Sequence, residues 1–159
     1  GFLFRQHFAE VQALWDEIVR RAMAAKVKVI QEDPYERDRR AALNLGHTLG
    51  HALEIASDYR LRHGEAVGIG TLAAARLSEK QGMAEAPLSE SIAAALRGLG
   101  LLTSIPSGLD RQRILTAMRM DKKKAAGRVR FVLPCRIGEV RWGIEVENLD
   151  AVVDSVLEG

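Results

Sequence analysis

A long and mostly apolar segment, EAVGIGTLAAARLSEKQG, follows His63 and ends at Gly82. A helix on the surface of a protein carries one apolar stripe, whereas a helix that is apolar on most of its sides is buried. We therefore expect a helix from about His63 to Gly82 at the centre of the fold. No apolar run in the chain approaches the length of a membrane span and no signal peptide is visible, so we expect no membrane partner.

Helical periodicity also marks the segments on either side of this helix. Apolar residues recur at spacings of three, four and seven, which is typical of a helix with one buried face. A residue before proline resists the α conformation, so Asp33-Pro34 should end the first helix, and Asn148 is placed to cap the last. Besides the central helix, the predicted helices are residues 3–31, 40–56, 86–100, 109–121 and 149–158.

The pattern changes near the C-terminus. The segments RVRFVLP (128–134) and GEVRWGIEV (138–146) have the length and composition of strands and are joined around CRIG. Elsewhere alanine and leucine are abundant and aromatic residues make up only 5% of the chain, which favours helix. We therefore predict one mainly α domain, residues 1–159, with a small β hairpin near its C-terminus.

The charge and cysteine content exclude some classes of protein. A net charge of +2 is too small to indicate a nucleic-acid partner, and the lysine run at 122–124 has no interleaved aromatic residues. Cys135 is the single cysteine, so no disulfide can form within the chain. It lies in an apolar run, where a small buried hydrophobic residue is expected rather than a catalytic thiol. A reducing, cytoplasmic setting is the expected location.

Three of the four histidines lie between residues 47 and 63. In the segment NLGHTLGHALE, His47 and His51 are four residues apart and should lie on one helical face, about 6 Å apart along the axis. A tight turn can fold His63 back towards His47, so that three imidazoles converge where a divalent metal can bind. Gly46 and Gly50 indicate a close approach of backbone or ligand. The alternative is that the histidines are ordinary polar surface residues.

Basic and polar residues near these histidines suggest an anion-binding rim. Arg40 and Asn44 would share a helical face with His47, and Lys26 lies near the end of the first helix. Arginine binds a phosphate or carboxylate with its planar fork and lysine with a point charge. The alternative is that each is a solvated charge, and lysines at 122–124 would also complement a helix dipole. The residues alone predict a metal-binding helical domain that handles a small phosphorylated or carboxylated compound.

The segments RAALNLGHTLGHALE, HGEAVGIG and MDKKKAAGRVRFVLPCRIGEV together resemble the C-terminal, metal-binding domain of 3-dehydroquinate synthases. The resemblance implies cyclisation of 3-deoxy-D-arabino-heptulosonate 7-phosphate to 3-dehydroquinate with loss of phosphate, a step of the shikimate pathway. It also implies two cofactors: NAD, which accepts and returns a hydride, and a divalent metal, zinc or cobalt. The full-length enzyme is expected to be a homodimer.

The resemblance assigns roles to the residues that match the family's motifs. His47 and His63 resemble two of three metal ligands, whereas His51 resembles a residue that assists proton transfer or contacts phosphate. Glu54 and Asp121 also match the pattern, and a structural role fits them at least as well. The residues implied to contact substrate are Lys26, Arg40, Asn44, His51 and one of Lys122 and Lys123; the first three and His51 are also the implied catalytic residues.

The chain departs from the family by what it lacks. The third metal ligand of the family is a glutamate that precedes this region, and no glycine-rich nucleotide-binding loop follows a predicted strand. We therefore expect a fragment without the N-terminal NAD-binding domain, inactive alone and a weak metal binder. The alternatives are a related sugar-phosphate cyclase, a glycerol-dehydrogenase-like metal-dependent alcohol dehydrogenase domain, or a non-catalytic helical fragment.

Overall fold

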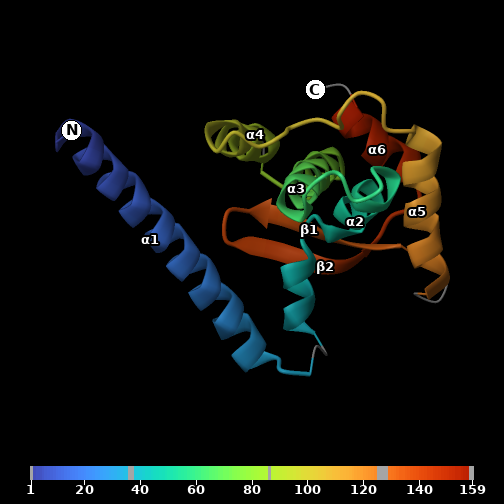
Figure 1. Ribbon diagram of the computed structural model, residues 1–159. Coiled ribbons are helices and arrows are strands. Elements are labelled where there is room, and N and C mark those ends of the chain that lie inside the picture. Colours follow the sequence, from blue (N-terminus) through green and yellow to red (C-terminus); the bar gives the residue numbers. More distant parts are fainter. Residues whose placement is uncertain (1, 36–37, 86, 125–128, 158–159) are drawn as a thin grey trace. The chain divides into compact units, whose positions relative to one another are not determined.

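The computed structural model (Figure 1) describes the backbone of residues 2–35, 38–85, 87–124 and 129–157, and side chains in these ranges except 2–13 and 121–124. The chain divides into two compact units, Gly1–Leu43 and Asn44–Gly159. The histidines at 47, 51 and 63 all lie in the second unit. Within the described residues, no helix has the length and hydropathy that crossing a bilayer requires.

The first unit consists mainly of one long helix. Helix α1 spans Phe2–Glu32, which confirms the helix predicted over residues 3–31 and its end before Asp33-Pro34. The Asp33 carboxylate then accepts hydrogen bonds from the backbone N–H groups of Asp38 (2.8 Å) and Arg40 (3.0 Å). These bonds cap the short 3₁₀ helix η1, Arg39–Asn44, which leads towards the second unit.

The predicted helix over residues 40–56 is wrong at its start. Helix α2 spans only His47–Ala56, and it is preceded by Gly46 in a left-handed conformation with φ of +78°. A Cβ atom at Gly46 would lie 2.5 Å from the Thr71 hydroxyl oxygen and 2.6 Å from the Val67 carbonyl oxygen. The chain bends at Gly46 because the helix that contains Val67 and Thr71 occupies the space beside it. Arg40 and Asn44 therefore do not share a helical face with His47.

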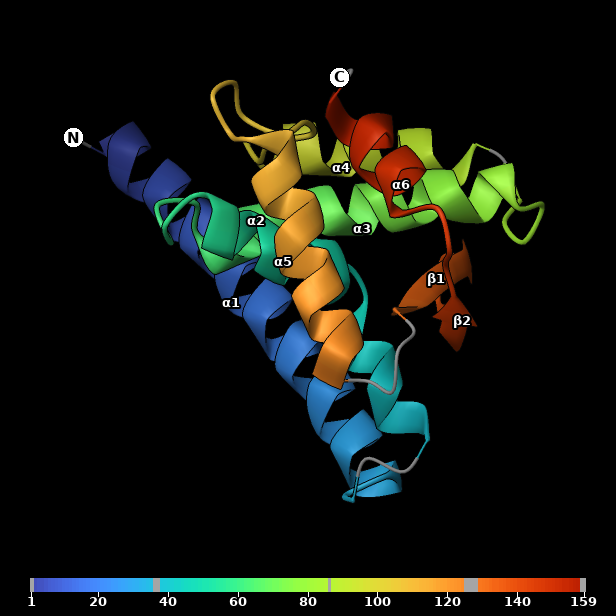
Figure 2. The same ribbon diagram turned by 90° about the vertical axis from the view of Figure 1, so that its right-hand side faces the viewer.

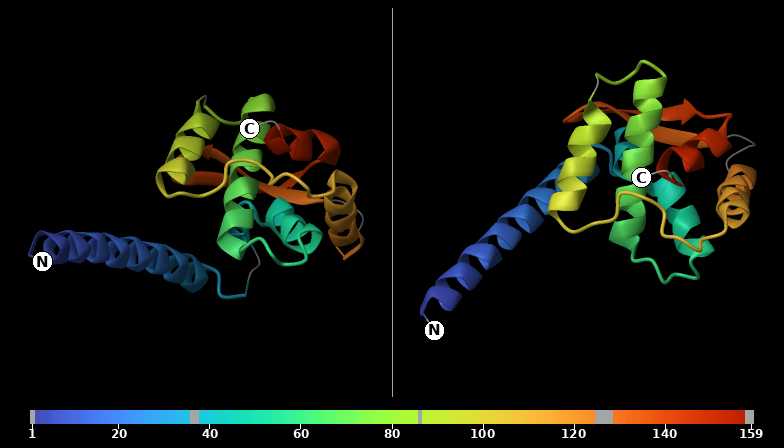
Figure 3. Two further views of the ribbon diagram at one scale, coloured as in Figure 1. Left: turned by 45° about the horizontal axis from the view of Figure 1, so that its top comes forward. Right: turned by 90° about the horizontal axis from the view of Figure 1, so that it is seen from above.

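The central helix of the second unit is α3, His63–Lys80, as predicted, although it ends two residues before Gly82. Its buried residues include Ile69, Leu72 and Ala75. It contacts α2, α4 (Leu88–Gly98), α6 (Leu149–Leu157) and the first strand of the hairpin. Figure 3 shows α3 between α4 on one side and α2 and α6 on the other. The many small side chains of α3 allow these neighbours to pack closely around it.

Helix α5, Arg111–Lys124, packs on α2 and α6 and ends three residues later than predicted. Lysine is a good helix former, so the lysine run extends the helix instead of ending it. Figure 2 shows α5 crossing in front of α2. Arg111 joins α5 to α6 through ion pairs with Asp150 (2.9 Å) and Asp154 (2.7 Å). Asn148 caps α6 as predicted, because its Oδ1 accepts the backbone N–H of Ala151 at 3.0 Å.

The predicted β hairpin is confirmed. Strands β1 (Arg130–Arg136) and β2 (Glu139–Glu145) pair antiparallel. The middle of β1 is buried against α3, and the buried Ser78 hydroxyl donates a 2.6 Å hydrogen bond to the Pro134 carbonyl. Cys135 lies in this strand and is buried, also as predicted. The fold is therefore mainly α with one two-stranded hairpin among the described residues.

Candidate functional site

The crossing of α2 and α3 places the site. A Cβ atom at Gly70 would lie only 2.0 Å from the Gly46 carbonyl oxygen, and one at Gly50 would lie 3.2 Å from the Val67 Cα. The two helices therefore touch through their backbones, which confirms the close approach predicted for Gly46 and Gly50. This contact fixes the start of α2, where His47 lies, against α3.

Three imidazoles converge beside this crossing. The ring centroids of His47 and His63 are 5.3 Å apart, those of His47 and His51 are 5.4 Å apart, and those of His51 and His63 are 6.1 Å apart. The convergence predicted from the sequence is therefore confirmed. His47 and His51 are one turn apart on α2, whereas His63 is the first residue of α3.

Hydrogen bonds distinguish the three rings. The Nδ1 atom of His47 lies 3.1 Å from the Leu45 carbonyl oxygen, and that of His63 lies 3.2 Å from Glu54 Oε1. A carbonyl or carboxylate oxygen only accepts, so both Nδ1 atoms donate and both Nε2 atoms keep a lone pair in the neutral ring. In the part of the chain that the structure describes, neither ring nitrogen of His51 has a hydrogen-bond partner.

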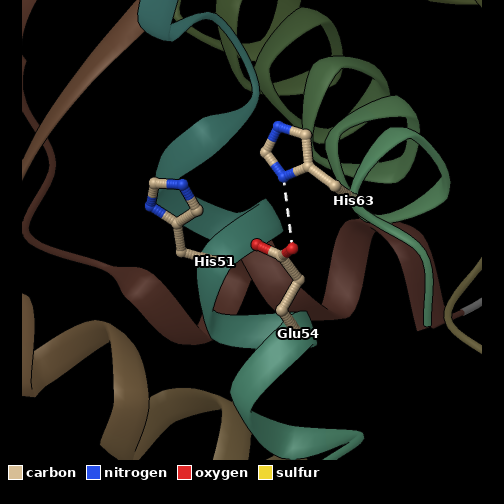
Figure 4. Close-up of side chains that lie close together, drawn as sticks. All are labelled: His51, Glu54 and His63. Atoms are coloured by element: carbon tan, nitrogen blue, oxygen red, sulfur yellow. Dashed lines mark hydrogen bonds and ion pairs between the residues drawn. The ribbon is translucent and has the colours of Figure 1, made fainter. Parts of the chain in front are cut away.

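A carboxylate joins the cluster. Figure 4 shows the Glu54 side chain of α2 directed at His63, with His51 on the same side of the helix. Ligand atoms of His51, Glu54 and His63 all lie within 4.8 Å of one another. Two ligand atoms of one zinc ion lie at most about 4 Å apart. The ligand atoms of these three side chains would therefore need to approach one another by less than about 1 Å to bind one ion. The residues present thus fit a divalent ion, and Glu54's spacing of three from His51 is the sequence signal for its place here.

The turn that connects α2 to α3 brings His63 into position. Asp58 and Tyr59 both have left-handed backbone conformations, with φ of 53° and 58°. Asp58 is held by an ion pair with Arg113 of α5, and this guanidinium holds the pKa of the Asp58 carboxyl below its ordinary value of 3.8. A cavity of about 410 Å³ adjoins the turn between Arg60 and residues 106–109, and none of the three histidines lines it.

The predicted substrate-contacting residues lie in different parts of the chain. Lys26 belongs to α1 and Arg40 to η1, both in the first unit, and Arg40 Nη1 donates to the Pro34 carbonyl at 3.1 Å. Asn44 is the exposed last residue of η1, three residues before His47. The predicted contacts at Lys122 and Lys123 fall on side chains outside the described residues. Within the second unit, the predicted residues that the structure brings together are the three histidines.

Comparison with solved structures supports the fold. The chain matches 2-deoxy-scyllo-inosose synthase, solved with carbaglucose-6-phosphate, NAD+ and Co2+, with a TM-score of 0.75 and 24% identity; 86% of this chain and 40% of that chain are covered. A 2-epi-5-epi-valiolone synthase from Streptomyces hygroscopicus, solved with NAD+ and Zn2+, matches with a TM-score of 0.74 and 21% identity over 89% of this chain and 40% of that chain. At these identities the likeness concerns the fold alone.

Comparison of sequences is more specific. A 3-dehydroquinate synthase of Nostoc punctiforme is 44% identical over 147 residues, which are 92% of this chain and 40% of the relative. One of Xanthomonas axonopodis pv. citri is 40% identical over 98% of this chain and 45% of the relative. The chain therefore spans less than half the length of these curated relatives. A family model described as 3-dehydroquinate synthase C-terminal matches residues 4–124. The chain belongs to the 3-dehydroquinate synthase family and corresponds to its C-terminal part.

Proposed function

We propose that this chain is the metal- and substrate-binding part of a 3-dehydroquinate synthase. The complete enzyme would convert 3-deoxy-D-arabino-heptulosonate 7-phosphate to 3-dehydroquinate with loss of phosphate, as a carbon–oxygen lyase of the shikimate pathway. The relatives at 40–44% identity carry this name, which supports the activity. The observation that carries the proposal is the pair of imidazoles at residues 47 and 63, 5.3 Å apart and each with its Nδ1 already bonded.

We assign His47 and His63 as ligands of the divalent metal. A histidine that binds a metal usually donates its other N–H to a carbonyl or carboxylate, and both rings have such a bond. By distance alone, the group among the described residues that could hold an ion is His51 with Glu54 and His63, which does not include His47. We prefer His47 because the Leu45 carbonyl fixes its ring, whereas no described residue makes such a bond to the His51 ring. Zinc or cobalt is proposed because the structural neighbours contain Zn2+ or Co2+.

The unanchored His51 suits a different task. Its exposed imidazole lies beside the two proposed ligands, and histidine is the side chain that most often serves as a general acid or base. We propose that it transfers protons or contacts the phosphate of the substrate. When bound, the metal polarises the substrate oxygens at the carbon that is oxidised, and NAD takes up and returns a hydride.

The remaining roles rest on the family motifs. We propose that the Asn44 amide hydrogen-bonds the substrate, and that Lys26, Arg40 and either Lys122 or Lys123 bind its carboxylate and phosphate. The residues that bind NAD are proposed to lie mainly outside these 159 residues, so the isolated chain is expected to be inactive. The complete protein is proposed to be a cytoplasmic homodimer.

Metal binding tests the site directly. The 159-residue chain is titrated with Co2+ alone, followed by visible absorption, and its thermal unfolding is recorded with and without excess Zn2+. We expect Zn2+ to raise the Tm of the wild-type chain and of His51→Ala, but not that of His47→Ala or His63→Ala. An unchanged Tm in every protein would favour a non-catalytic helical fragment. If Zn2+ raised the Tm of His47→Ala but not that of His51→Ala, His51 would be the metal ligand and His47 would take the role proposed for His51.

A related sugar-phosphate cyclase is the second candidate, because the fold also matches a synthase solved with carbaglucose-6-phosphate. A chimera in which this chain replaces the matching segment of the Nostoc punctiforme relative separates the two. We expect phosphate release from 3-deoxy-D-arabino-heptulosonate 7-phosphate in the presence of NAD and zinc. Turnover of a hexose 6-phosphate in its place would favour the second candidate.

A further inference from the structure

The carboxylate of Glu54 lies against one of the proposed metal ligands. Its Oε1 atom is 3.2 Å from His63 Nδ1, and the contact joins the last part of α2 to the first residue of α3 (Figure 4). The Glu54 side chain is only 15% exposed, whereas that of His63 is 57% exposed. A largely buried carboxylate needs a hydrogen-bond partner, and this imidazole supplies one.

The backbone of Glu54 is fixed by hydrogen bonds to its carbonyl oxygen. Its carbonyl oxygen accepts the Tyr59 N–H at 2.7 Å and the Ser57 hydroxyl at 3.0 Å. The buried Ser57 hydroxyl in turn accepts the Leu61 N–H at 3.2 Å, which ties the α2–α3 turn together. The residue that accepts the His63 hydrogen bond is therefore also the residue whose carbonyl holds the turn.

Among the described residues, the bond to Glu54 is the hydrogen bond that holds the His63 ring. Its backbone is held at the start of α3, where the Glu65 carboxylate accepts the Arg62 N–H at 3.0 Å and completes a capping box. That bond sets the backbone and not the ring, which projects mostly into solvent. An imidazole in water can rotate and exchange its proton between nitrogens, and the bond at the other nitrogen decides which one keeps the lone pair.

We propose that Glu54 is a positioning residue, whose carboxylate accepts a hydrogen bond from the Nδ1–H of His63 and so presents the unprotonated Nε2 atom to the divalent metal. This inference rests on the proposed function, because it concerns the same metal site. A carboxylate behind a ligand histidine fixes the tautomer and the ring orientation and makes the ligand more basic. Glu54 itself acts through His63 and is not a ligand.

The tautomer of His63 in the metal-free chain tests this directly. Long-range ¹H–¹⁵N correlation spectra are recorded at about pH 8.5, well above the ordinary histidine pKa, and the His63 signals are identified by their loss in His63→Gln. We expect the proton on Nδ1 in the wild-type chain and in Glu54→Gln, whose amide oxygen still accepts it. In Glu54→Ala we expect the proton to move substantially to Nε2. A purely structural role for Glu54 would leave the tautomer unchanged.

Co2+ affinity of the same chains supplies the second measurement. Loss of a partner behind a ligand histidine typically weakens binding by about 10–100-fold, which we expect for Glu54→Ala, with a smaller loss for Glu54→Gln. The matched control is Glu65→Gln, which removes a neighbouring carboxylate but keeps the capping box, since glutamine also completes it. It should retain wild-type affinity and the wild-type tautomer.

Several results would overturn the proposal. A wild-type His63 that carries its proton on Nε2 refutes it without any variant, so the test stands even if Glu54→Ala fails to fold. A Glu54→Gln chain that loses as much Co2+ affinity as Glu54→Ala would make Glu54 a ligand instead. If the wild-type chain binds no Co2+ but shows the expected tautomers, the proposed metal site fails and the positioning of His63 by Glu54 is upheld.

Discussion

Replacing Gly70 with alanine should separate α2 from α3. The added Cβ would lie 2.0 Å from the Gly46 carbonyl oxygen, 2.9 Å from the Gly46 carbonyl carbon and 3.1 Å from the Gly50 nitrogen. All three atoms are backbone, so no side chain can turn away. Overpacking costs about 1–3 kcal/mol, and a rigid collision belongs at the upper end. Alanine regains about 1 kcal/mol in helix propensity, which leaves a net loss of about 2 kcal/mol.

Thermal unfolding followed by circular dichroism measures this loss. For a chain of this size, about 2 kcal/mol corresponds to a fall in Tm of about 4–8 °C. The matched control is Gly68→Ala on the same helix, where the new Cβ meets only the end of the flexible Leu96 side chain at 3.3 Å. The control should melt at or slightly above the wild-type temperature. Equal stability of Gly70→Ala and Gly68→Ala would refute a backbone collision at Gly70.

Two further substitutions probe polar contacts outside the site. Asp58→Asn removes the ion pair with Arg113. The pKa of Asp58 in the folded protein lies below its ordinary value of 3.8. The ion pair therefore stabilises the fold at pH values above 3.8, and this stabilisation is lost as the pH falls through the folded pKa. The Tm difference from wild type should thus be present at neutral pH and vanish in strong acid, and a difference that persists there would contradict this. Asn148→Ala removes the α6 cap and should cost about 1 kcal/mol in stability, or about 2–4 °C in Tm. Asn148→Asp keeps the cap and serves as the control. Equal Tm values of the two variants would argue against the cap.

The types of the elements could be predicted because each is set by local periodicity. The apolar run after His63 identified the central helix, and the change of pattern after residue 128 identified the hairpin. The start of α2 could not be predicted in this way. Gly46 adopts its left-handed conformation because Val67 and Thr71, more than twenty residues later, occupy the neighbouring space. Short-range patterns contain no information about such a contact.

The site was predictable to a similar extent. The spacing of four placed His47 and His51 together on α2, and the short connection suggested that His63 would return to them. The exact turn was hidden, because Asp58 and Tyr59 adopt left-handed conformations for which neither residue type is a strong signal. The contact between Glu54 and His63 depends on that turn. The placement of Lys26 and Arg40 near the substrate stays a prediction.

One helix carries both a histidine of the site and the buried centre of the second unit. His63 begins α3, and Gly70, two turns later, fixes that helix against α2. One residue inserted between them would move the imidazole by about 1.5 Å and swing it by about 100° around the axis. An insertion between His63 and Gly70 is therefore expected to remove the imidazole from the site, whereas an insertion in the connection 99–110 would leave this spacing intact.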